Sequence, residues 1–312
     1  MSTVVSIVDV QKRYQSGDFW RPLKAQALRG VSFDVQEGEL FGLVGLNGAG
    51  KSTLMKMAVG LLRPDSGTLS LFGLDPRSRE ARRRFGFLPE LPYFPGYLSA
   101  KEVLTYYGRL HGFSGAGLRA RVDGVIEQVN LAHAKDEPIR RYSKGMQQRV
   151  GLAQTLLHDP ELLFLDEPMS GLDPQGMKEM RDIILAQKAA GKTIFINTHS
   201  LAEVERICDR VAQMHKGRLL LLEGVSELVR SHQSNVVLGF PGGADLGSRI
   251  EALGLNGRLE NKVWTVSVAN HELGRAFEAL QGLLGTAPSV ISFGSPLETA
   301  FLAAIAKEDA HA

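Results

Sequence analysis

The chain has few of the features that mark a secreted or a nucleic-acid-binding protein. Its 312 residues include a single cysteine, Cys208. One cysteine cannot form an internal disulfide or a thiolate metal cluster, and this count is typical of a reducing compartment. The formal net charge is only +2, so the overall charge gives no support for nucleic acid as a partner.

Long apolar runs are absent as well. No stretch of about 18 consecutive apolar residues occurs in the sequence, which argues against a membrane-spanning helix. We expect no signal peptide, because Asp9, Lys12 and Arg13 interrupt the first apolar stretch. If the protein works at a membrane, we therefore expect it to act through another chain.

What the sequence does contain is a pattern of strands and helices. Strands are predicted at Val4–Val10, Val31–Val35, Leu40–Val44, Gly67–Gly73, Leu162–Leu165 and Thr193–Ile196, with helices near 52–59, 147–157 and 175–190. Apolar strands that alternate with helices are typical of a mostly parallel sheet covered on both faces. We therefore predict an α/β domain over residues 1–226. Ser99 and Glu102 form a capping-box pattern that opens a helix inside a helical subdomain at about 91–150.

The composition changes after about Glu227. Three strands are predicted, at Asn235–Phe240, Val263–Val268 and Val290–Phe293, with helices between and after them. This pattern predicts a small α+β accessory domain over residues 227–312. It carries no phosphate, metal or nucleophile pattern, so we expect it to mediate dimer or regulatory contacts rather than catalysis.

The strongest local signal is the segment from Gly45 to Ser52, Gly-Leu-Asn-Gly-Ala-Gly-Lys-Ser. It fits the Walker A pattern of a phosphate-binding loop and lies between a predicted buried strand and a predicted helix. Glycines let successive N–H groups point at phosphate oxygens, and the helix dipole adds positive potential. Lys51 is expected to contact the outer phosphates, and the hydroxyl of Ser52 suits Mg²⁺.

A second segment places two carboxylates at the end of a buried strand. Leu162–Leu165 is followed directly by Asp166 and Glu167. In a parallel sheet this is the carboxyl edge, where ligands bind. We predict that Asp166 holds Mg²⁺ through its water shell and that Glu167 polarises the attacking water.

Three further segments complete an ordered set of motifs. They are Tyr142-Ser-Lys-Gly-Met-Gln-Gln-Arg149, Ser170-Gly-Leu-Asp173 and Thr198-His199. In this order and at these spacings, residues 4–224 resemble the ATPase subunits of ABC transporters, which have a P-loop NTPase fold.

The resemblance implies a role for each matching residue. Ser143–Gln147, the signature loop, would bind the γ-phosphate of ATP held by the opposite subunit. His199 would contact the γ-phosphate and the attacking water, Asp173 would lie in a loop crossing the dimer interface, and Tyr14 would stack on adenine. The predicted catalytic residues are thus Glu167 and His199. The predicted nucleotide-binding residues are Tyr14, Gly45, Asn47, Gly48, Gly50, Lys51, Ser52, Thr53, Ser143, Gly145, Gln147 and Asp173.

The chain departs from the family pattern at two positions. The first of two adjacent glycines in the signature loop is Lys144 here, as in one subset of the family. Glu90 replaces a glutamine that follows the strand near Phe87. Because a carboxylate can still ligate Mg²⁺, the predicted metal-binding residues are Ser52, Glu90 and Asp166.

The resemblance also implies partners. The apolar segment Leu91–Tyr97 corresponds to a region that borders the groove for a permease helix, so part of it is expected to be exposed. The segment Ser295–Leu302 resembles the tail of subunits that pair with separately encoded, export-type permeases. The expected ligands are ATP and Mg²⁺, and the expected partners are an integral membrane permease and a second ATPase subunit, either a copy of this chain or a related one. The expected location is the cytoplasmic face of the cell membrane, attached through the permease.

Two alternatives remain open from the sequence alone. One is a soluble ABC ATPase acting on ribosomes or nucleic acid, although such proteins typically carry two ATPase modules or a long coiled-coil insertion. The other is a subunit that senses ATP without hydrolysing it, which the joint presence of Glu167 and His199 opposes. The leading hypothesis is an ATPase that energises transport, most simply export, through a separate permease.

Overall fold

The computed structural model describes residues 2–16, 23–232, 235–242, 246–260, 263–269, 272–285, 288–293 and 296–309. Within it the chain forms two compact units, Met1–Leu222 and Glu223–Ala312, which are described separately below. The boundary expected from composition, between residues 226 and 227, lies close to this division.

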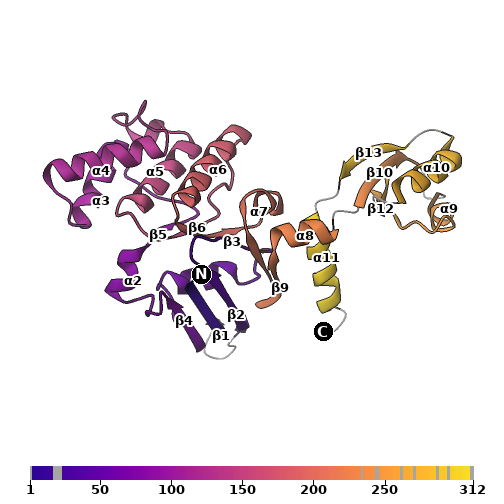
Figure 1. The fold of residues 1–312 in the computed structure, drawn as a ribbon, viewed down its shortest axis with the longest axis horizontal. Helices are drawn as coiled ribbons and strands as arrows, with labels where there is room; N and C mark the ends of the chain where they lie inside the picture. The colour runs from indigo at the N-terminus through magenta and orange to yellow at the C-terminus, as the bar shows by residue number, and fades with distance from the viewer. Residues whose placement is uncertain are drawn as a thin grey trace. The chain divides into compact units, whose positions relative to one another are not determined.

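The first unit is built on a six-stranded sheet of order β5-β6-β7-β3-β8-β9 (Figure 1). Its strands are β3 (Leu40–Gly45), β5 (Phe85–Leu88), β6 (Leu162–Asp166), β7 (Thr193–Thr198), β8 (Arg210–His215) and β9 (Arg218–Gly224). The pairs β5–β6, β6–β7, β7–β3 and β3–β8 are parallel. The mostly parallel sheet and the α/β class are therefore confirmed, and the carboxyl ends of β3, β6 and β7 meet at one edge.

A separate three-stranded sheet lies beside the parallel one. It has the order β2-β1-β4, and its strands β1 (Thr3–Ser16), β2 (Leu23–Gln36) and β4 (Ser66–Leu71) pair in antiparallel fashion. The prediction of short strands at the start of the chain was wrong in length, because β1 and β2 extend well beyond their apolar centres. Cross-strand pairing along their whole length supports residues that local pattern does not favour.

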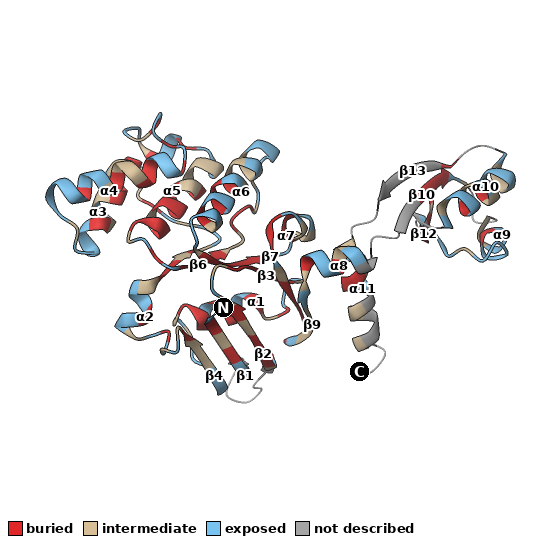
Figure 2. Cartoon of the chain, in the orientation of Figure 1, coloured by how far each residue is buried: buried red, intermediate tan, exposed pale blue. Residues whose placement is uncertain are grey.

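Aromatic side chains join the two sheets. The ring centroids of Phe33 in β2 and Phe41 in β3 are 5.1 Å apart, and the contact continues from Phe41 to Phe195 in β7 at 5.4 Å. Phe195 in turn lies 5.5 Å from Phe164 in β6. Figure 2 shows buried residues concentrated along these strands. Each such pair contributes roughly 0.5–1.5 kcal/mol to stability beyond the effect of its buried area, so the aromatic row helps to hold the two sheets against each other.

Helices cover the parallel sheet. The first unit contains α1 (Lys51–Ala58), α2 (Arg79–Arg84), α3 (Ala100–Leu110), α4 (Gly115–Gln128), η1 (Ile139–Arg141), α5 (Lys144–Leu156), α6 (Pro174–Ala189) and α7 (Leu201–Ile207). The predicted capping box is confirmed: the Ser99 side chain accepts from the Glu102 N–H, and the Glu102 carboxylate accepts from the Ser99 N–H. Helices α3, α4 and α5 occupy the region predicted as a helical subdomain (Figure 1).

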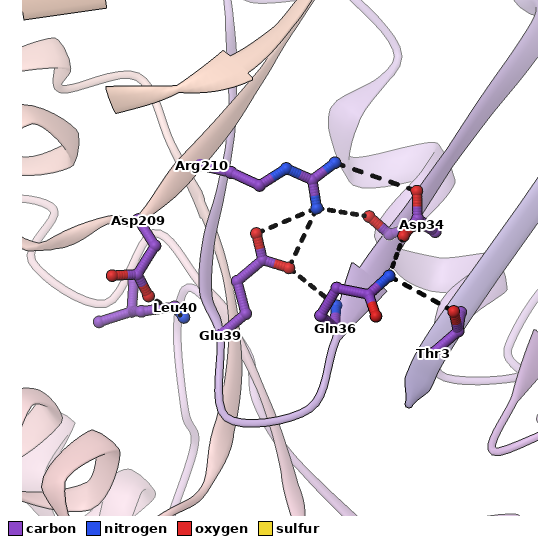
Figure 3. A network of polar contacts seen from close by, with 7 residues as sticks. All are labelled: Thr3, Asp34, Gln36, Glu39, Leu40, Asp209 and Arg210. Carbon is purple, nitrogen blue, oxygen red and sulfur yellow. Dashed lines mark hydrogen bonds and ion pairs between the residues drawn. The ribbon is translucent and has the colours of Figure 1, made fainter. Parts of the chain in front are cut away.

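A polar network connects the turn after β2 with the start of β8 (Figure 3). Nη1 of Arg210 lies 3.1 and 3.2 Å from the two carboxylate oxygens of Glu39, and the N–H of Gln36 donates to the same carboxylate at 2.7 Å. Glu39 is only 7% exposed. Burial raises the pKa of Glu39, and the bonds from Gln36 and Arg210 oppose that rise.

This network predicts unequal effects of removing its two charges. Arg210→Met would leave the buried Glu39 carboxylate without its cation, and we expect a loss of about 2–4 kcal/mol in the free energy of unfolding. Glu39→Gln keeps the shape and removes the buried charge, so we expect a loss below about 1 kcal/mol. Urea denaturation of both variants checks this. Equal losses would mean that Glu39 does not depend on Arg210.

The second unit has a β-α-β-β-α-β order of ferredoxin-like type. Its sheet order is β11-β12-β10-β13, and the strands whose pairing the structure describes are antiparallel. The elements are α8 (Val225–His232), β10 (Asn235–Pro241), α9 (Gly247–Glu251), β11 (Gly257–Glu260), β12 (Val263–Ala269), α10 (Leu273–Leu284), β13 (Ser289–Phe293) and α11 (Pro296–Asp309). Buried residues such as Phe240, Trp264 and Leu280 form its own core. Strand β11 is an addition to the three predicted ones.

Candidate active site

The loop from Gly45 to Ser52 joins β3 to α1, and glycines determine its path. A Cβ atom at Gly45 would lie 2.2 Å from the carbonyl oxygen of Met214 in β8, and one at Gly50 would lie 2.5 Å from that of Ala27 in β2. Gly50, the N-cap of α1, has a φ of 101°, which other residues rarely adopt. Only glycine fits both positions. The loop therefore delivers the chain directly into a helix N-terminus, where phosphate groups bind.

Lys51, the first residue of α1, is buried under this loop. Its Nζ donates to the carbonyl oxygens of Gly45 at 2.7 Å and Leu46 at 3.3 Å. Burial lowers the pKa of Lys51, while the carboxylates of Glu167 and Asp166 act in the opposite direction. The ammonium therefore lies within electrostatic reach of the carboxylates at the end of β6.

Asp166 is the last residue of β6 and lies next to a residue that the sequence analysis missed. Nδ2 of Asn197, in β7, donates to Oδ1 of Asp166 at 2.5 Å. Burial raises the pKa of Asp166, this hydrogen bond lowers it, and the neighbouring carboxylates of Glu167 and Glu90 raise it further. The carboxylates of Glu167 and Glu90 are thus close enough to influence Asp166 electrostatically at the carboxyl edge of the sheet.

Asn197 is only 1% exposed, and its Oδ1 has no hydrogen-bond partner in the described part of the chain. The available signal in the sequence was the polar run Asn197-Thr198-His199 at the end of an apolar strand. From the sequence, a functional role is predicted for His199 alone. The role of the nearby asparagine depends on β6 and β7 being neighbours, which the sequence does not show.

Glu167 follows Asp166 in an uncommon backbone conformation. Its φ is 47°, in the left-handed region that residues with a side chain seldom occupy. Its N–H donates to the carbonyl oxygen of Asn197 at 2.8 Å, and its own carbonyl oxygen accepts from the N–H of Ser170 at 3.0 Å. These two bonds hold the residue in place, as is usual for backbone strain at functional sites.

His199, just beyond the end of β7, reaches the carboxylate of Glu167. Nδ1 of His199 is 2.8 Å from Oε2 of Glu167. The histidine side chain is 61% exposed, whereas that of Glu167 is only 13% exposed. The two residues predicted to act on water are therefore in direct contact, and the imidazole faces solvent.

The donor groups at this edge fit Mg²⁺. Ser52 offers a hydroxyl, and Asp166 and Glu90 offer carboxylates, the hard oxygen donors that Mg²⁺ prefers. Burial and the repulsion of the neighbouring carboxylates both raise the pKa of Asp166, and a divalent cation would offset both effects. Over the residues that the structure describes, no group of three or more His, Cys, Asp or Glu side chains could hold a metal ion. Mg²⁺ does not require such a group, because it usually keeps several waters and takes further ligands from phosphates.

The remaining predicted residues lie either beside α1 or at the N-termini of α5 and α6. Tyr14, in β1, is 3.5 Å from the Thr53 hydroxyl through its own hydroxyl, which places it beside α1. In the signature loop, the Ser143 side chain caps α5 by accepting from the Met146 N–H at 3.2 Å, and Gln147 Nε2 donates to the Tyr142 carbonyl oxygen at 3.2 Å.

Asp173 caps α6 by accepting from the Gly176 N–H at 2.9 Å. Among described residues, no hydrogen bond or ion pair joins Ser143, Gln147 or Asp173 to Lys51, Asp166 or Glu167. Within the described part of the chain, no polar contact therefore links these two sets of predicted residues.

Comparisons with known proteins agree with this arrangement. The family described as ABC transporter matches residues 28–170. An uncharacterized ABC transporter ATP-binding protein of Nostoc sp. is 47% identical over 76% of this chain and 71% of its own length. A fluoroquinolones export ATP-binding protein of Mycobacterium tuberculosis is 37% identical over 79% of this chain and 81% of its own.

Among solved structures, an ATP-binding subunit of an ABC transporter is 31% identical with a TM-score of 0.63, covering 73% of this chain and 92% of that chain. Together with the phosphate loop of β3–α1 and the carboxylates of β6, these matches identify the chain as a member of the ABC transporter ATP-binding protein family, an ATPase subunit that energises transport.

Proposed function

We propose that two ATPase subunits, two copies of this chain or this chain and a related one, enclose two ATP molecules between them. Each nucleotide would lie on the phosphate loop of one subunit and face the signature loop of the other. The contact between Glu167 and His199, beside the buried Lys51, is the observation that carries this proposal. Among the described residues, Ser143 and Asp173 make no polar contact with that group, which supports the proposal because a composite site takes residues from a partner.

Each residue group would have a defined task. The backbone of Gly45, Asn47, Gly48 and Gly50, together with Lys51, Ser52 and Thr53, would bind the phosphates, and Tyr14 would stack on adenine. Ser52, Asp166 and Glu90 would hold Mg²⁺, which when bound neutralises phosphate charge during phosphoryl transfer.

The hydrolytic step would depend on Glu167. Its carboxylate would orient the attacking water and accept its proton, while His199 would hold that carboxylate and contact the γ-phosphate. From the partner, Ser143, Gly145 and Gln147 would donate to the same phosphate, and Asp173 would lie across the interface.

We further propose that the subunit drives an export-type permease encoded separately, at the cytoplasmic face of the cell membrane. The M. tuberculosis relative is named for export and aligns with 79% of this chain. The apolar segment Leu91–Tyr97 offers a contact surface, since Leu91, Tyr93 and Tyr97 are 70%, 88% and 74% exposed.

In the tail that resembles exporter subunits, Pro296–Leu302 is helical and Ser295 lies outside the described residues. Among the helices that the structure describes, none has the length and apolar character of a membrane-spanning segment.

The composite site predicts how turnover depends on protein concentration. We expect ATP hydrolysis per subunit to rise with concentration until the dimer is saturated, and to be lost when EDTA removes Mg²⁺. Steady-state hydrolysis over a dilution series of the purified chain measures both effects. Turnover per subunit that is constant across the series, from a protein that stays monomeric by light scattering, would contradict the shared site.

A further inference from the structure

A buried amide side chain interrupts the apolar face of the parallel sheet. Residues two apart in a strand share a face, so Asn197 lies on the same side of β7 as Phe195, which belongs to the hydrophobic core. The register neighbours of Asn197 are Leu43 in β3, also a core residue, and Asp166 in β6. An apolar side chain would suit these surroundings, so the amide at this position requires an explanation.

Folding stability gives little reason for the amide. Oδ1 of Asn197 has no hydrogen-bond partner among the residues that the structure describes, and an unpartnered buried oxygen destabilises the folded state. Nδ2 makes one bond, to Asp166. Since Asp166 is only partly buried, water could satisfy its carboxylate instead. The amide is therefore better explained by what it does to Asp166.

Asn197 contacts both residues at the end of β6. Its side-chain Nδ2 donates to Oδ1 of Asp166 at 2.5 Å, and its backbone carbonyl oxygen accepts from the N–H of Glu167 at 2.8 Å. Every residue of β7 is buried, so Asn197 is a well-anchored point of attachment. One residue thus holds the predicted metal ligand through its side chain and the predicted base through its backbone.

The bond to Asp166 has a consequence for metal binding. Hydrogen bonds to a metal-binding carboxylate orient it and tune its affinity for the ion. With Oδ1 attached to β7, the carboxylate of Asp166 keeps one orientation. A side chain without a donor at position 197 would leave that carboxylate free to rotate, and ordering it would then oppose metal binding.

We propose that Asn197 is a positioning residue that orients Asp166 for Mg²⁺. The proposal rests on the proposed function, in which Asp166 holds Mg²⁺ beside the nucleotide. Because any residue at position 197 keeps the backbone carbonyl that holds Glu167, substitution of the side chain acts on the metal alone. Loss of the amide therefore weakens metal binding and leaves the binding of metal-free nucleotide unchanged.

Asn197→Leu keeps the branched shape of the side chain and removes the donor. Mn²⁺, which suits the same oxygen ligands as Mg²⁺, is titrated into the ADP-loaded full chain and followed by electron paramagnetic resonance. We expect Mn²⁺ affinity to fall about 10- to 100-fold, while the Kd for ADP in EDTA stays within about twofold of wild type. The urea midpoint should stay close to wild type, because one hydrogen bond and one unpartnered buried oxygen are lost together. Asn197→Ala also lacks the donor, adds no bulk, and should give the same loss of Mn²⁺ affinity.

The matched control is a second buried amide. Gln187, in α6, is 6% exposed, and its backbone carbonyl oxygen accepts from the N–H of Lys192, just before the amino end of β7. Gln187→Leu makes the same chemical change at the opposite edge of the sheet. We expect Mn²⁺ affinity within about twofold of wild type, because distant sites act independently.

A double-mutant cycle separates this proposal from the metal site on which it rests. Asp166→Asn should itself weaken Mn²⁺ binding, and adding Asn197→Leu should weaken it no further, because Asn197 acts through Asp166. Wild-type Mn²⁺ affinity in Asn197→Leu and Asn197→Ala, or losses that add in the double variant, would overturn the positioning role alone. Wild-type Mn²⁺ affinity in Asp166→Asn would overturn the proposed metal site and the positioning role with it.

Discussion

Replacing Glu167 by glutamine is expected to reduce ATP turnover by about 10²–10⁴-fold while leaving ATP binding intact. The amide cannot accept the proton of the attacking water, and the loss of a general base typically slows a reaction by a factor of this size. Binding should persist because Lys51 and the phosphate loop are unchanged. The shape of the side chain is also kept, so Gln at 167 can still hydrogen-bond Nδ1 of His199. Steady-state hydrolysis and ATP titration of the same preparation measure the two quantities.

The matched control lies at the other end of the same strand. Glu161 precedes β6 at its amino end, where its exposed carboxylate pairs with Arg84 at 2.7 Å. Glu161→Gln makes the same chemical change away from the carboxyl edge, so we expect turnover within about twofold of wild type, because exposed ion pairs contribute little. If Glu167→Gln kept wild-type turnover, Glu167 would not be the base.

Replacing Lys51 by alanine is expected to act on binding itself. Charged hydrogen bonds are worth about 1.5–3 kcal/mol, so the loss of this ammonium should weaken ATP affinity by roughly 10- to 100-fold. The fold should tolerate the change, since burial of Lys51 lowers its pKa and so disfavours its charged form in the apo protein. Calorimetric titration with ATP and a urea denaturation curve give the two results.

The second control is Lys178→Ala, which removes an exposed cation from α6. It should leave ATP affinity unchanged. Unaltered affinity in Lys51→Ala would remove this lysine from the phosphate site, and a collapse of stability without a change in affinity would assign it a structural role instead.

Much of the site could be predicted because its parts are local in sequence. The phosphate loop needs Gly45 and Gly50 within a few residues of Lys51, and the steric reason, the carbonyl oxygens of Met214 and Ala27, does not have to be known. In the same way, Ser99 and Glu102 form a capping box through contacts three residues apart. Asp166 and Glu167 could be placed at the carboxyl edge because a buried apolar strand precedes them.

The features that were missed depend on contacts between distant segments. The hydrogen bond from Asn197 to Asp166 exists because β7 lies next to β6, and the ends of β1 and β2 are strands because they pair with one another. The four residues of β11 are too few for a periodic pattern, and pairing with β12 determines their conformation.

The most direct test of the shared site is the oligomeric state of Glu167→Gln with nucleotide. Light scattering after gel filtration should give a dimer with Mg²⁺ and ATP, and a monomer with ADP or without nucleotide. Adding Ser143→Arg to this variant should abolish the dimer, because the signature loop would then exclude the partner's phosphate. A variant that binds ATP yet remains monomeric at every concentration would contradict the composite site.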